Sequence, residues 1–314
     1  MNETNQTAEN GFTLLGLSTI PYLQAIFFSL FLAMYVATLV GNTLLIVAVR
    51  LNTQLQTPMY FFLSNLAFID ICFSSTVIPQ LLANTLVDDG KISLLGCATQ
   101  MFISLVLGAT ECLLLAVMSF DRYAAICKPL HYNVIMNRKL CISLTTGCWT
   151  VCIINSCVHV VLTFKLPFCR SHHVNHFFCE GPPFFRMSCS DPLINEIAMY
   201  VSVVVIVTCS FLLTLVSYIH IISTILNIHS SDGRHKVFST CASHLIVVSL
   251  YYTTIMSMYL QPHSAYSPKT DKDISLLYTT VTPMLNPIVY SIRNKLVKGT
   301  IQRIFTRHIF IHNY

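Results

Sequence analysis

Charged residues are scarce in this chain: only 10% of its 314 residues are Asp, Glu, Lys or Arg, whereas 54% are hydrophobic. About a quarter of the residues in an ordinary soluble domain are charged, so this composition excludes such a domain and favours a chain that is solvated by lipid. The amino-terminal residues also lack the basic start of a cleaved signal peptide. We therefore expect the first apolar segment to be retained as an uncleaved anchor.

Tandem repeats, linkers and low-complexity tracts are absent as well. A channel or transporter built from two related halves would show paired, interrupted apolar segments in corresponding positions. No such symmetry is evident, so this class stays only as an alternative. The sequence predicts a single domain over residues 1–314, with a tail at 1–24, a helical body at 25–292 and a further tail at 293–314.

Long apolar segments with few or no charges dominate the body of the chain. A helix needs about 20 apolar residues to cross the hydrocarbon core of a bilayer. Seven segments satisfy this requirement, namely Ala25–Val49, Pro58–Leu86, Cys97–Ile126, Leu140–Phe164, Glu196–Asn227, Val237–Leu260 and Asp273–Ile292. The expected fold is therefore an all-α membrane protein, a bundle of seven transmembrane helices.

Lys and Arg are distributed unequally between the two sets of connections. Cytoplasmic loops carry the excess of these residues, and here the excess falls in the set that includes Arg50, Arg122, Arg138 and Lys139. This places the amino terminus outside the cell, and it accounts for the net charge of +5 without nucleic-acid binding. Asn2 and Asn5, each followed two residues later by Thr, are glycan acceptor sequences in the tail that is expected to be outside.

Four cysteines are expected at or beyond the outer membrane surface, where an oxidising compartment preserves disulfides. They are Cys97, Cys169, Cys179 and Cys189, and sequence alone allows three pairings. The last three lie in the one long connection, Lys165–Asn195, which we expect to lie across the outer mouth of the bundle. After the seventh segment, apolar residues recur at helical spacing among basic ones, which predicts a short amphipathic eighth helix on the inner membrane surface.

Several motifs resemble those of one receptor family. They are MSFDRYAAIC (118–127), KPLHY (128–132), KVFSTCASHL (236–245), PMLNPIVYSIRN (283–294), PMYFFLSNLAFID (58–70), Gly41-Asn42 and Ser217-Tyr218. Together they resemble the vertebrate odorant receptors of the tetrapod-type class, which are rhodopsin-like G-protein-coupled receptors. KVFSTCASHL is nearly specific to that family, whereas Asp121-Arg122-Tyr123 and Asn286-Pro287 are shared by the whole superfamily.

The resemblance implies a function and a location. We expect a plasma-membrane receptor, not an enzyme, that binds a small odorant and activates a heterotrimeric G protein of the olfactory stimulatory type. The same receptor acting as a chemosensor in a non-olfactory tissue remains an alternative. The resemblance also implies disulfides Cys97–Cys179 and Cys169–Cys189, and a G-protein switch formed by Asp121, Arg122, Tyr123, Tyr218, Asn286, Pro287 and Tyr290.

Two carboxyl groups are expected at one depth in the membrane. At 1.5 Å per residue, Asp70 and Glu111 lie about 18 and 15 Å from the inner ends of their helices, and Asn42 and Asn286 fall near the same level. Ionisable groups at this depth are costly and are rarely kept without a partner or a function. The pair predicts a sodium ion or a shared proton, with a plain hydrogen-bonded structural cluster as the alternative. The segments lack the motifs of an intramembrane aspartyl protease.

Histidines gather in the long connection at His172, His173 and His176, near Cys179 and Glu180. These residue types bind zinc or copper, but their spacing fits no simple metal site and a disulfide would consume Cys179. We therefore favour hydrogen bonding within the loop over a metal. His159, one turn after Asn155, fits either a ligand contact or a core hydrogen bond.

The ligand pocket is inferred from helix faces, since residues at i, i+3 and i+4 share one side of a helix. The expected lining residues are Ser104, Leu105, Gly108, Ala109 and Cys112 in the third segment, Ser202, Val203 and Ile206 in the fifth, and Tyr252, Ile255, Met256 and Tyr259 in the sixth. Packing between helices is the alternative role for any of them. The seventh segment contains no lysine within the span, which excludes a retinal Schiff base, and the few charges nearby favour a small, largely neutral ligand.

Overall fold

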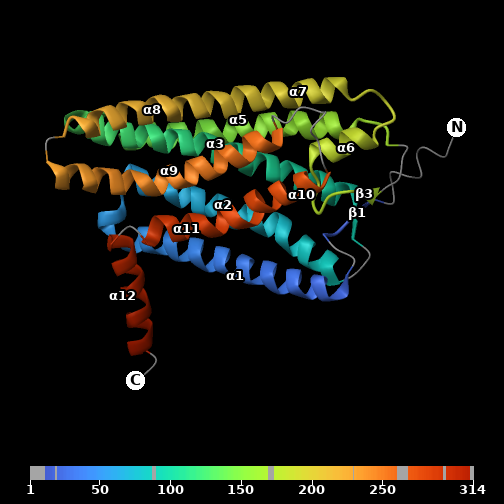
Figure 1. Ribbon diagram of the computed structural model, residues 1–314, viewed down its shortest axis with the longest axis horizontal. Helices are drawn as coiled ribbons and strands as arrows, with labels where there is room; N and C mark the ends of the chain where they lie inside the picture. The colour runs from blue at the N-terminus through green and yellow to red at the C-terminus, as the bar shows by residue number, and fades with distance from the viewer. Residues whose placement is uncertain are drawn as a thin grey trace.

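The computed structural model describes residues 11–17, 20–86, 90–168, 173–228, 230–259, 268–292 and 295–311. In this part of the chain, long helices lie side by side along one axis (Figure 1). The spanning helices are α1 (Pro21–Leu51), α2 (Pro58–Leu86), α3 (Leu94–Cys127), α5 (Arg138–Phe164), α7 and α8 (Leu193–Val203 and Cys209–Leu226), α9 (Ser231–Tyr259), and α10 and α11 (Pro268–Leu276 and Thr282–Ile292).

Each of the seven expected segments corresponds to one of these spans, and α2 has the expected bounds. Six spans of the described chain are long and apolar enough to cross a membrane, with α7 and α8 counted together as one of them. The seventh is divided by a π-helical turn, Leu277–Val281, into α10 and α11. A second π-helical turn, Val204–Thr208, joins α7 to α8. The seven-helix bundle predicted from the sequence is thus confirmed.

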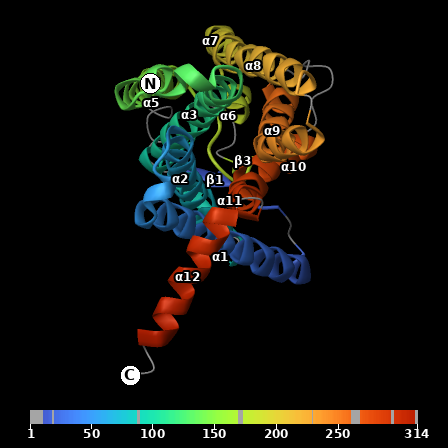
Figure 2. The same ribbon diagram turned by 90° about the vertical axis from the view of Figure 1, so that its left-hand side faces the viewer.

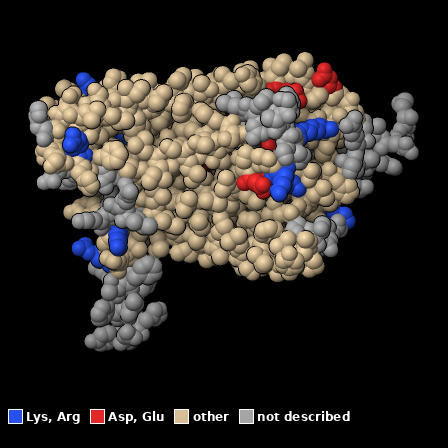
Figure 3. Space-filling view, in the orientation of Figure 1, with Lys and Arg blue, Asp and Glu red and all other residues tan. Residues whose placement is uncertain are grey.

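The sides of the bundle are apolar. Large apolar side chains such as Ile154, Val205 and Ile219 are 60%, 56% and 56% exposed. In the space-filling view, charged side chains gather toward the two ends of the visible face and leave a broad uncharged belt between them (Figure 3). Such a belt suits hydrocarbon and not water.

Helix α3 is the central element of the bundle. It packs against α2, α5, α8 and α9, and the view along the bundle shows it surrounded by them (Figure 2). In its most apolar stretch 67% of the residues are buried, against 22% in α1 and α5. Residues on α3 are therefore well placed to line an internal site, whereas α1 and α5 turn most of their surface outward.

One end of the bundle, called here the sheet end, carries short elements that the sequence did not predict. Strand β1 (Phe12–Leu14) pairs antiparallel with β2 (Lys91–Ile92) and parallel with β3 (His173–Val174). A short helix, α6 (Gly181–Met187), follows in the same loop as β3. Gly11 enters β1 with a φ of 76°, which L side chains rarely adopt. The sheet ties the amino-terminal segment to the loops that cover this end.

The opposite end, called here the α12 end, holds α4 (Tyr132–Ile135), 3-10 turns at Thr53–Leu55 and Pro129–His131, and α12 (Lys295–Ile311). Helix α12 leaves the bundle at a steep angle (Figures 1 and 2). Val297 is fully buried, and the side chain of Asn52 donates a hydrogen bond of 2.7 Å to Thr300 Oγ1. The expected eighth helix is therefore present and is attached to the end of α1.

A disulfide joins Cys97, in the first turn of α3, to Cys179 in the long loop, as expected. Cys189 is also disulfide-bonded, but its expected partner, Cys169, lies outside the described residues. Gln100 lies one turn below Cys97, where it accepts a hydrogen bond from the Cys179 backbone N–H at 2.9 Å and donates one to Thr76 O at 2.9 Å. The loop is therefore fixed to both α3 and α2.

Breaking the Cys97–Cys179 bond should destabilise the protein, because the bond closes a sequence separation of 82 residues. Loss of a native disulfide costs about 2–5 kcal/mol in small secreted domains. We expect Cys97→Ala to lower the melting temperature of the protein and the amount of folded protein that is expressed. The double variant Cys97→Ala/Cys179→Ala should be no less stable than the single variant. Cys157→Ala, which removes an exposed free thiol, should have little effect on stability. A double variant much less stable than either single variant would contradict a shared bond.

Candidate functional site

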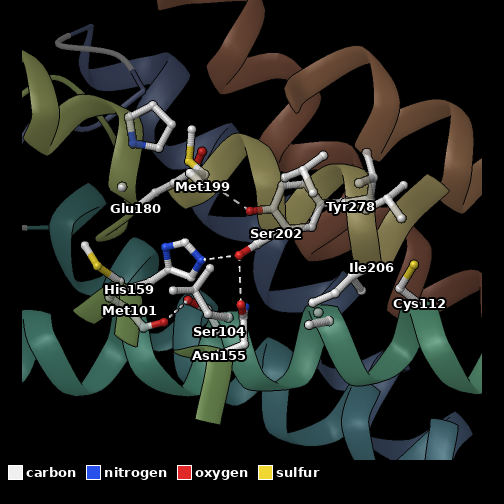
Figure 4. A pocket seen from close by; sticks show the side chains of 18 of the residues that line it. Met101, Ser104, Cys112, Asn155, His159, Glu180, Met199, Ser202, Ile206 and Tyr278 are labelled. Atoms are coloured by element: carbon white, nitrogen blue, oxygen red, sulfur yellow. Dashed lines mark hydrogen bonds between the residues drawn. The ribbon is translucent and has the colours of Figure 1, made fainter. Parts of the chain in front are cut away.

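A cavity of about 120 Å³ lies toward the sheet end, beneath the loop that contains α6. Helices α3, α5, α7 and α9 form its walls (Figure 4). Its described lining residues are Phe73, Met101, Ser104, Leu105, Gly108, Ala109, Glu111, Cys112, Asn155, His159, Thr163, Phe178, Cys179, Glu180, Gly181, Pro182, Phe185, Met199, Ser202, Val203, Ile206, Val207, Tyr251, Ile255 and Tyr278. The walls are thus mostly apolar, with a few polar groups.

The lining residues expected on α3 and on α7 with its π turn all face this cavity. They are Ser104, Leu105, Gly108, Ala109, Cys112, Ser202, Val203 and Ile206. On α9 only Ile255 of the expected residues lines it, together with Tyr251. Tyr252 and Met256 are not in the described lining, and the side chain of Tyr259 lies outside the described residues. Tyr251 and Ile255 share one face through i, i+4 spacing, so the cavity face of α9 is rotated by one residue from the expected one.

The two neighbouring tyrosines of α9 connect that helix to α3. Tyr251 donates its hydroxyl to the carbonyl of Gly108 at 2.6 Å, and Tyr252 donates to the carbonyl of Cys112 at 3.3 Å. Tyr252 is buried, and its ring packs edge-on against Phe211 of α8 at a centroid distance of 5.5 Å. Tyr252 therefore packs between helices and is not among the described lining residues, and its expected role as a ligand contact stays a prediction.

A polar group on α5 and α7 forms part of the cavity wall (Figure 4). Ser202 Oγ donates to Asn155 Oδ1 at 2.8 Å and lies 2.8 Å from His159 Nε2. Because a hydroxyl has one proton and Ser202 gives it to Asn155, His159 must donate to Ser202 through Nε2. The arrangement leaves the His159 Nδ1 lone pair as an acceptor, and it answers the question that the sequence left open: His159 is hydrogen-bonded and also faces the cavity.

A second polar group covers the cavity from the loop. Glu180 is buried, and its Oε2 accepts a hydrogen bond of 3.3 Å from the hydroxyl of Tyr278. Burial, and then the nearby Asp271, raise the pKa of Glu180 from 4.5 to about 8. At neutral pH this side chain is therefore mostly a neutral carboxylic acid, which both donates and accepts hydrogen bonds.

Sequence reasoning did not assign Glu180, Tyr278 or Tyr251 to the ligand site. A signal for Glu180 was present, because it directly follows Cys179, whose disulfide to the first turn of α3 fixes the loop over the interior of the bundle. The residue after Cys179 is consequently aimed at the cavity. Tyr251 and Tyr278 gave no comparable signal, since both lie in helices with apolar residues on several faces.

His176, one of the suggested metal ligands, is buried between aromatic rings. Its ring stacks on Phe177 at 4.7 Å, and neither ring nitrogen has a hydrogen-bond partner among the described residues. Burial, and then the charge of Lys272, lower the pKa of His176 from 6.5 to about 3. His172 lies outside the described residues. Within the described chain, no group of three or more His, Cys, Asp or Glu side chains could hold a metal ion.

The expected polar network is assembled by α1, α2, α3 and α11. Asn286 Nδ2 donates to both carboxylate oxygens of Asp70, at 3.1 and 3.0 Å, and Asn42 Nδ2 donates to the carbonyls of Thr38 and Pro283 at 3.0 and 3.1 Å. Asp70 and Glu111 are both buried. Glu111 Oε1 and Asn42 Oδ1 have no hydrogen-bond partner in the described structure, so this network holds two unused acceptors.

The expected switch residues lie toward the α12 end. Asp121 accepts a hydrogen bond of 2.8 Å from Tyr132 OH, a partner that the sequence did not suggest. Tyr218 OH lies 2.6 Å from His244 Nδ1, which belongs to the KVFSTCASHL motif. The guanidinium Nε of Arg122 and the hydroxyl of Tyr290 are buried without hydrogen-bond partners among the described residues. Several polar groups are thus held here with unused hydrogen-bonding capacity.

The buried carboxyl of Glu180 generates a pH prediction. A folded-state pKa of about 8, against 4.5 for the free side chain, means that the folded state retains a proton that the unfolded state loses. The stability that this proton confers is present below pH 4.5 and is lost as the pH rises through about 8. The lowered pKa of His176 has the opposite effect: stability rises with pH, but only below pH 6.5, the ordinary pKa of this side chain. Between pH 6.5 and about pH 8 the melting temperature of the protein should therefore fall as the pH rises.

Glu180→Gln should reduce this change of melting temperature with pH, because the amide does not ionise. Asp191→Asn, which alters an exposed acid, should leave the change as it is in the wild type. Thermal unfolding of the purified protein and both variants at several pH values measures this. Equal slopes in the wild type and Glu180→Gln would show that Glu180 does not govern the pH dependence.

Comparison with known proteins identifies the family. A family model described as "Olfactory receptor" matches residues 31–308. The chain is 47% identical over 302 residues to olfactory receptor 2G6 of Homo sapiens, with 96% of each chain covered. It is 45% identical over 304 residues to olfactory receptor 1f45 of Rattus norvegicus, with 97% of each covered, and 44% identical over 310 residues to olfactory receptor 1F1 of Homo sapiens, with 99% of each covered. The family model and these relatives, together with the helix bundle, show that the chain belongs to the olfactory receptor family. Members of this family are odorant-sensing G-protein-coupled receptors and not enzymes.

Proposed function

We propose that this receptor binds one small, largely neutral odorant in the cavity beneath the loop, and that binding activates a heterotrimeric G protein of the olfactory stimulatory type at the α12 end. The observation that carries the proposal is the cavity itself, which combines apolar walls with two separate polar groups. This is the usual composition of a small-molecule site, where apolar contacts give affinity and a few polar groups fix orientation.

The size of the cavity supports a small ligand. An apolar cavity of about 150 Å³ holds one benzene molecule, and this cavity measures about 120 Å³. A single ring or a short chain fits this space, whereas a steroid or a peptide does not. Its polar groups favour a ligand that carries one hydroxyl or carbonyl. Ser202 and His159 offer one hydrogen-bonding position, and the neutral acid of Glu180 offers another.

We propose a plasma-membrane location with the sheet end and the amino terminus outside the cell. The Cys97–Cys179 disulfide lies at the sheet end, and disulfides persist in the oxidising compartment outside the cell. The excess of Lys and Arg toward the α12 end favours a cytoplasmic position for that end. Asn2 and Asn5, the proposed glycan sites, lie outside the described residues.

We also propose a switch at the α12 end. In the arrangement described here, Asp121 is engaged by Tyr132, and Arg122 lies near the paired Tyr218 and His244 and near Tyr290. Activation would release Arg122 from Asp121 toward the G protein. Tyr123, Asn286 and Pro287 belong to the same proposed machinery.

The network of Asp70, Glu111, Asn42 and Asn286 would hold a sodium ion or a shared proton, and this too is a proposal. Two carboxyl groups with an unused oxygen on Glu111 form a suitable set of hard oxygen donors. The ion would neutralise negative charge at a depth where an uncompensated carboxylate is costly.

Enlarging Gly108 should narrow the cavity. A Cβ there would meet only Phe73 Cε2, at 3.9 Å, so alanine fits without strain. We expect Gly108→Ala, and more strongly Gly108→Val, to lower the potency of bulky agonists by about tenfold more than the potency of slender ones. This is the lower end of the discrimination that one added methylene gives in a pocket. Agonists found by screening an odorant panel would be compared by cyclic AMP response at matched surface expression.

Gly147→Ala is the matched control, because no atom lies within 4 Å of its added Cβ and the residue does not line the cavity. If both Gly108 variants change the potency of every agonist by the same factor, Gly108 acts through folding or coupling, and the assignment of Gly108 to the pocket fails. Ligand-evoked ion flux without cyclic AMP would overturn the proposed coupling altogether.

Arg122→Ala should abolish odorant-evoked cyclic AMP while leaving surface expression near normal, because it removes the group proposed to meet the G protein. Asp121→Asn should raise basal cyclic AMP, since it removes the charge that holds Arg122. Tyr132→Phe should lower it, since it leaves the Asp121 carboxylate free to hold Arg122. Lys139→Ala, a loss of an exposed cation at the same end, serves as the control for net charge. Full signalling by Arg122→Ala would refute its role, and unchanged basal output in Tyr132→Phe would remove Tyr132 from the switch.

A further inference from the structure

A second hollow lies on the outside of the bundle at the α12 end. It is a groove of about 780 Å³ between the last turns of α1, the first turns of α2 and the first turns of α5. It shares no lining residue with the odorant cavity. Its described lining residues are Ile46, Val49, Arg50, Gln56, Thr57, Pro58, Phe61, Ser64, Asn65, Phe68, Met136, Arg138, Cys141 and Ile142.

The walls of the groove continue the lipid-facing surface of the bundle. Phe61, Phe68 and Ile142 are 37%, 51% and 47% exposed. The view from the α12 end shows α5, α2 and α1 following one another down one side of the molecule (Figure 2). An elongated apolar molecule lying along this side would therefore remain within the hydrocarbon layer.

The mouth of the groove is basic. Arg50 lies in the last turn of α1 and Arg138 is the first residue of α5, and both side chains are exposed. No Asp or Glu is among the residues that line the groove. The helix dipole favours a cation at the end of α1 but disfavours one at the start of α5. An anion placed beside Arg138 and the first backbone N–H groups of α5 would reverse that unfavourable interaction.

We propose that this groove binds a phospholipid with an anionic headgroup, with its headgroup between Arg50 and Arg138 and an acyl chain along Phe61, Phe68 and Ile142. Arginine suits the headgroup because its planar guanidinium binds phosphate or carboxylate through two parallel hydrogen bonds. Basic pockets between transmembrane helices on the cytoplasmic side are a known mode of lipid headgroup binding. A soluble phosphate would leave the apolar wall unused, and the membrane supplies the lipid at high local concentration.

Native mass spectrometry of the detergent-purified, full-length receptor tests this proposal. The receptor would be incubated with phosphatidylserine or with phosphatidylcholine of the same acyl chains, and lipid-bound species would be counted. We expect the wild type to retain one phosphatidylserine in preference to phosphatidylcholine. Arg50→Ala/Arg138→Ala should weaken phosphatidylserine retention by about tenfold, because each basic residue near a membrane surface contributes appreciably to anionic lipid binding.

The matched control is Lys128→Ala/Lys139→Ala, which removes the same charge from exposed positions at the same end that do not line the groove. It should retain phosphatidylserine like the wild type. Equal loss in both double variants would reduce the effect to net charge and overturn the proposal, as would equal retention of the two lipids by the wild type. Displacement of the lipid by water-soluble glycerophosphoserine at equal concentration would also overturn it, by showing that the acyl chain contributes nothing.

Folding is checked independently by odorant-evoked cyclic AMP and by the melting temperature of each variant. Arg50→Lys/Arg138→Lys retains the charge but not the planar fork, so it should bind phosphatidylserine with intermediate strength. This variant keeps the proposal testable should the alanine pair fold poorly, because retention at the alanine level or at the full wild-type level would contradict guanidinium recognition of the headgroup.

Discussion

The helical hydrogen bond that Pro287 cannot make determines how three helices meet. Proline has no backbone N–H, so the carbonyl of Pro283, one turn earlier, loses its helical donor. Asn42 of α1 supplies the missing donor at 3.1 Å, while the neighbouring Asn286 holds both carboxylate oxygens of Asp70 in α2. A buried polar group without a partner costs about 1–3 kcal/mol. The polar contacts therefore fix the register of α1, α2 and α11 in a bundle whose apolar contacts alone are not directional.

The cavity beneath the loop and this network are connected through α3. Glu111 lines the cavity and is also buried near Asp70, so one side chain belongs to both regions. The carbonyls of Gly108 and Cys112, two other cavity residues, accept hydrogen bonds from Tyr251 and Tyr252 of α9. A ligand that presses on this stretch of α3 acts on the contact between α3 and α9. The same two helices carry Arg122 and His244 toward the α12 end.

The sequence was most informative where one physical requirement acts alone. Crossing a bilayer requires long uncharged runs, so the spans were predictable, and α2 was predicted to the residue. The cavity face of α3 was predictable because small residues recur there at helical spacing. Helix α9 is apolar on several faces and has tyrosines at two consecutive positions, so periodicity could not decide which tyrosine faces inward. The contact between Tyr132 and Asp121 and the pairing of β1 with β3 depend on chain segments whose meeting no local pattern encodes.

The π-helical turns at Val204–Thr208 and Leu277–Val281 interrupt two of the helices around the cavity. A π turn accommodates one residue more than the α-helix that it interrupts, and one residue corresponds to a rotation of about 100° around a helix axis. Because the π turn already absorbs the extra residue, deleting a single residue within 204–208 would restore an α-helical turn and leave Met199 and Ser202 on the same face relative to α8. A deletion within α7 itself has no such turn to absorb it, and it would rotate the residues that precede it by about 100° relative to α8.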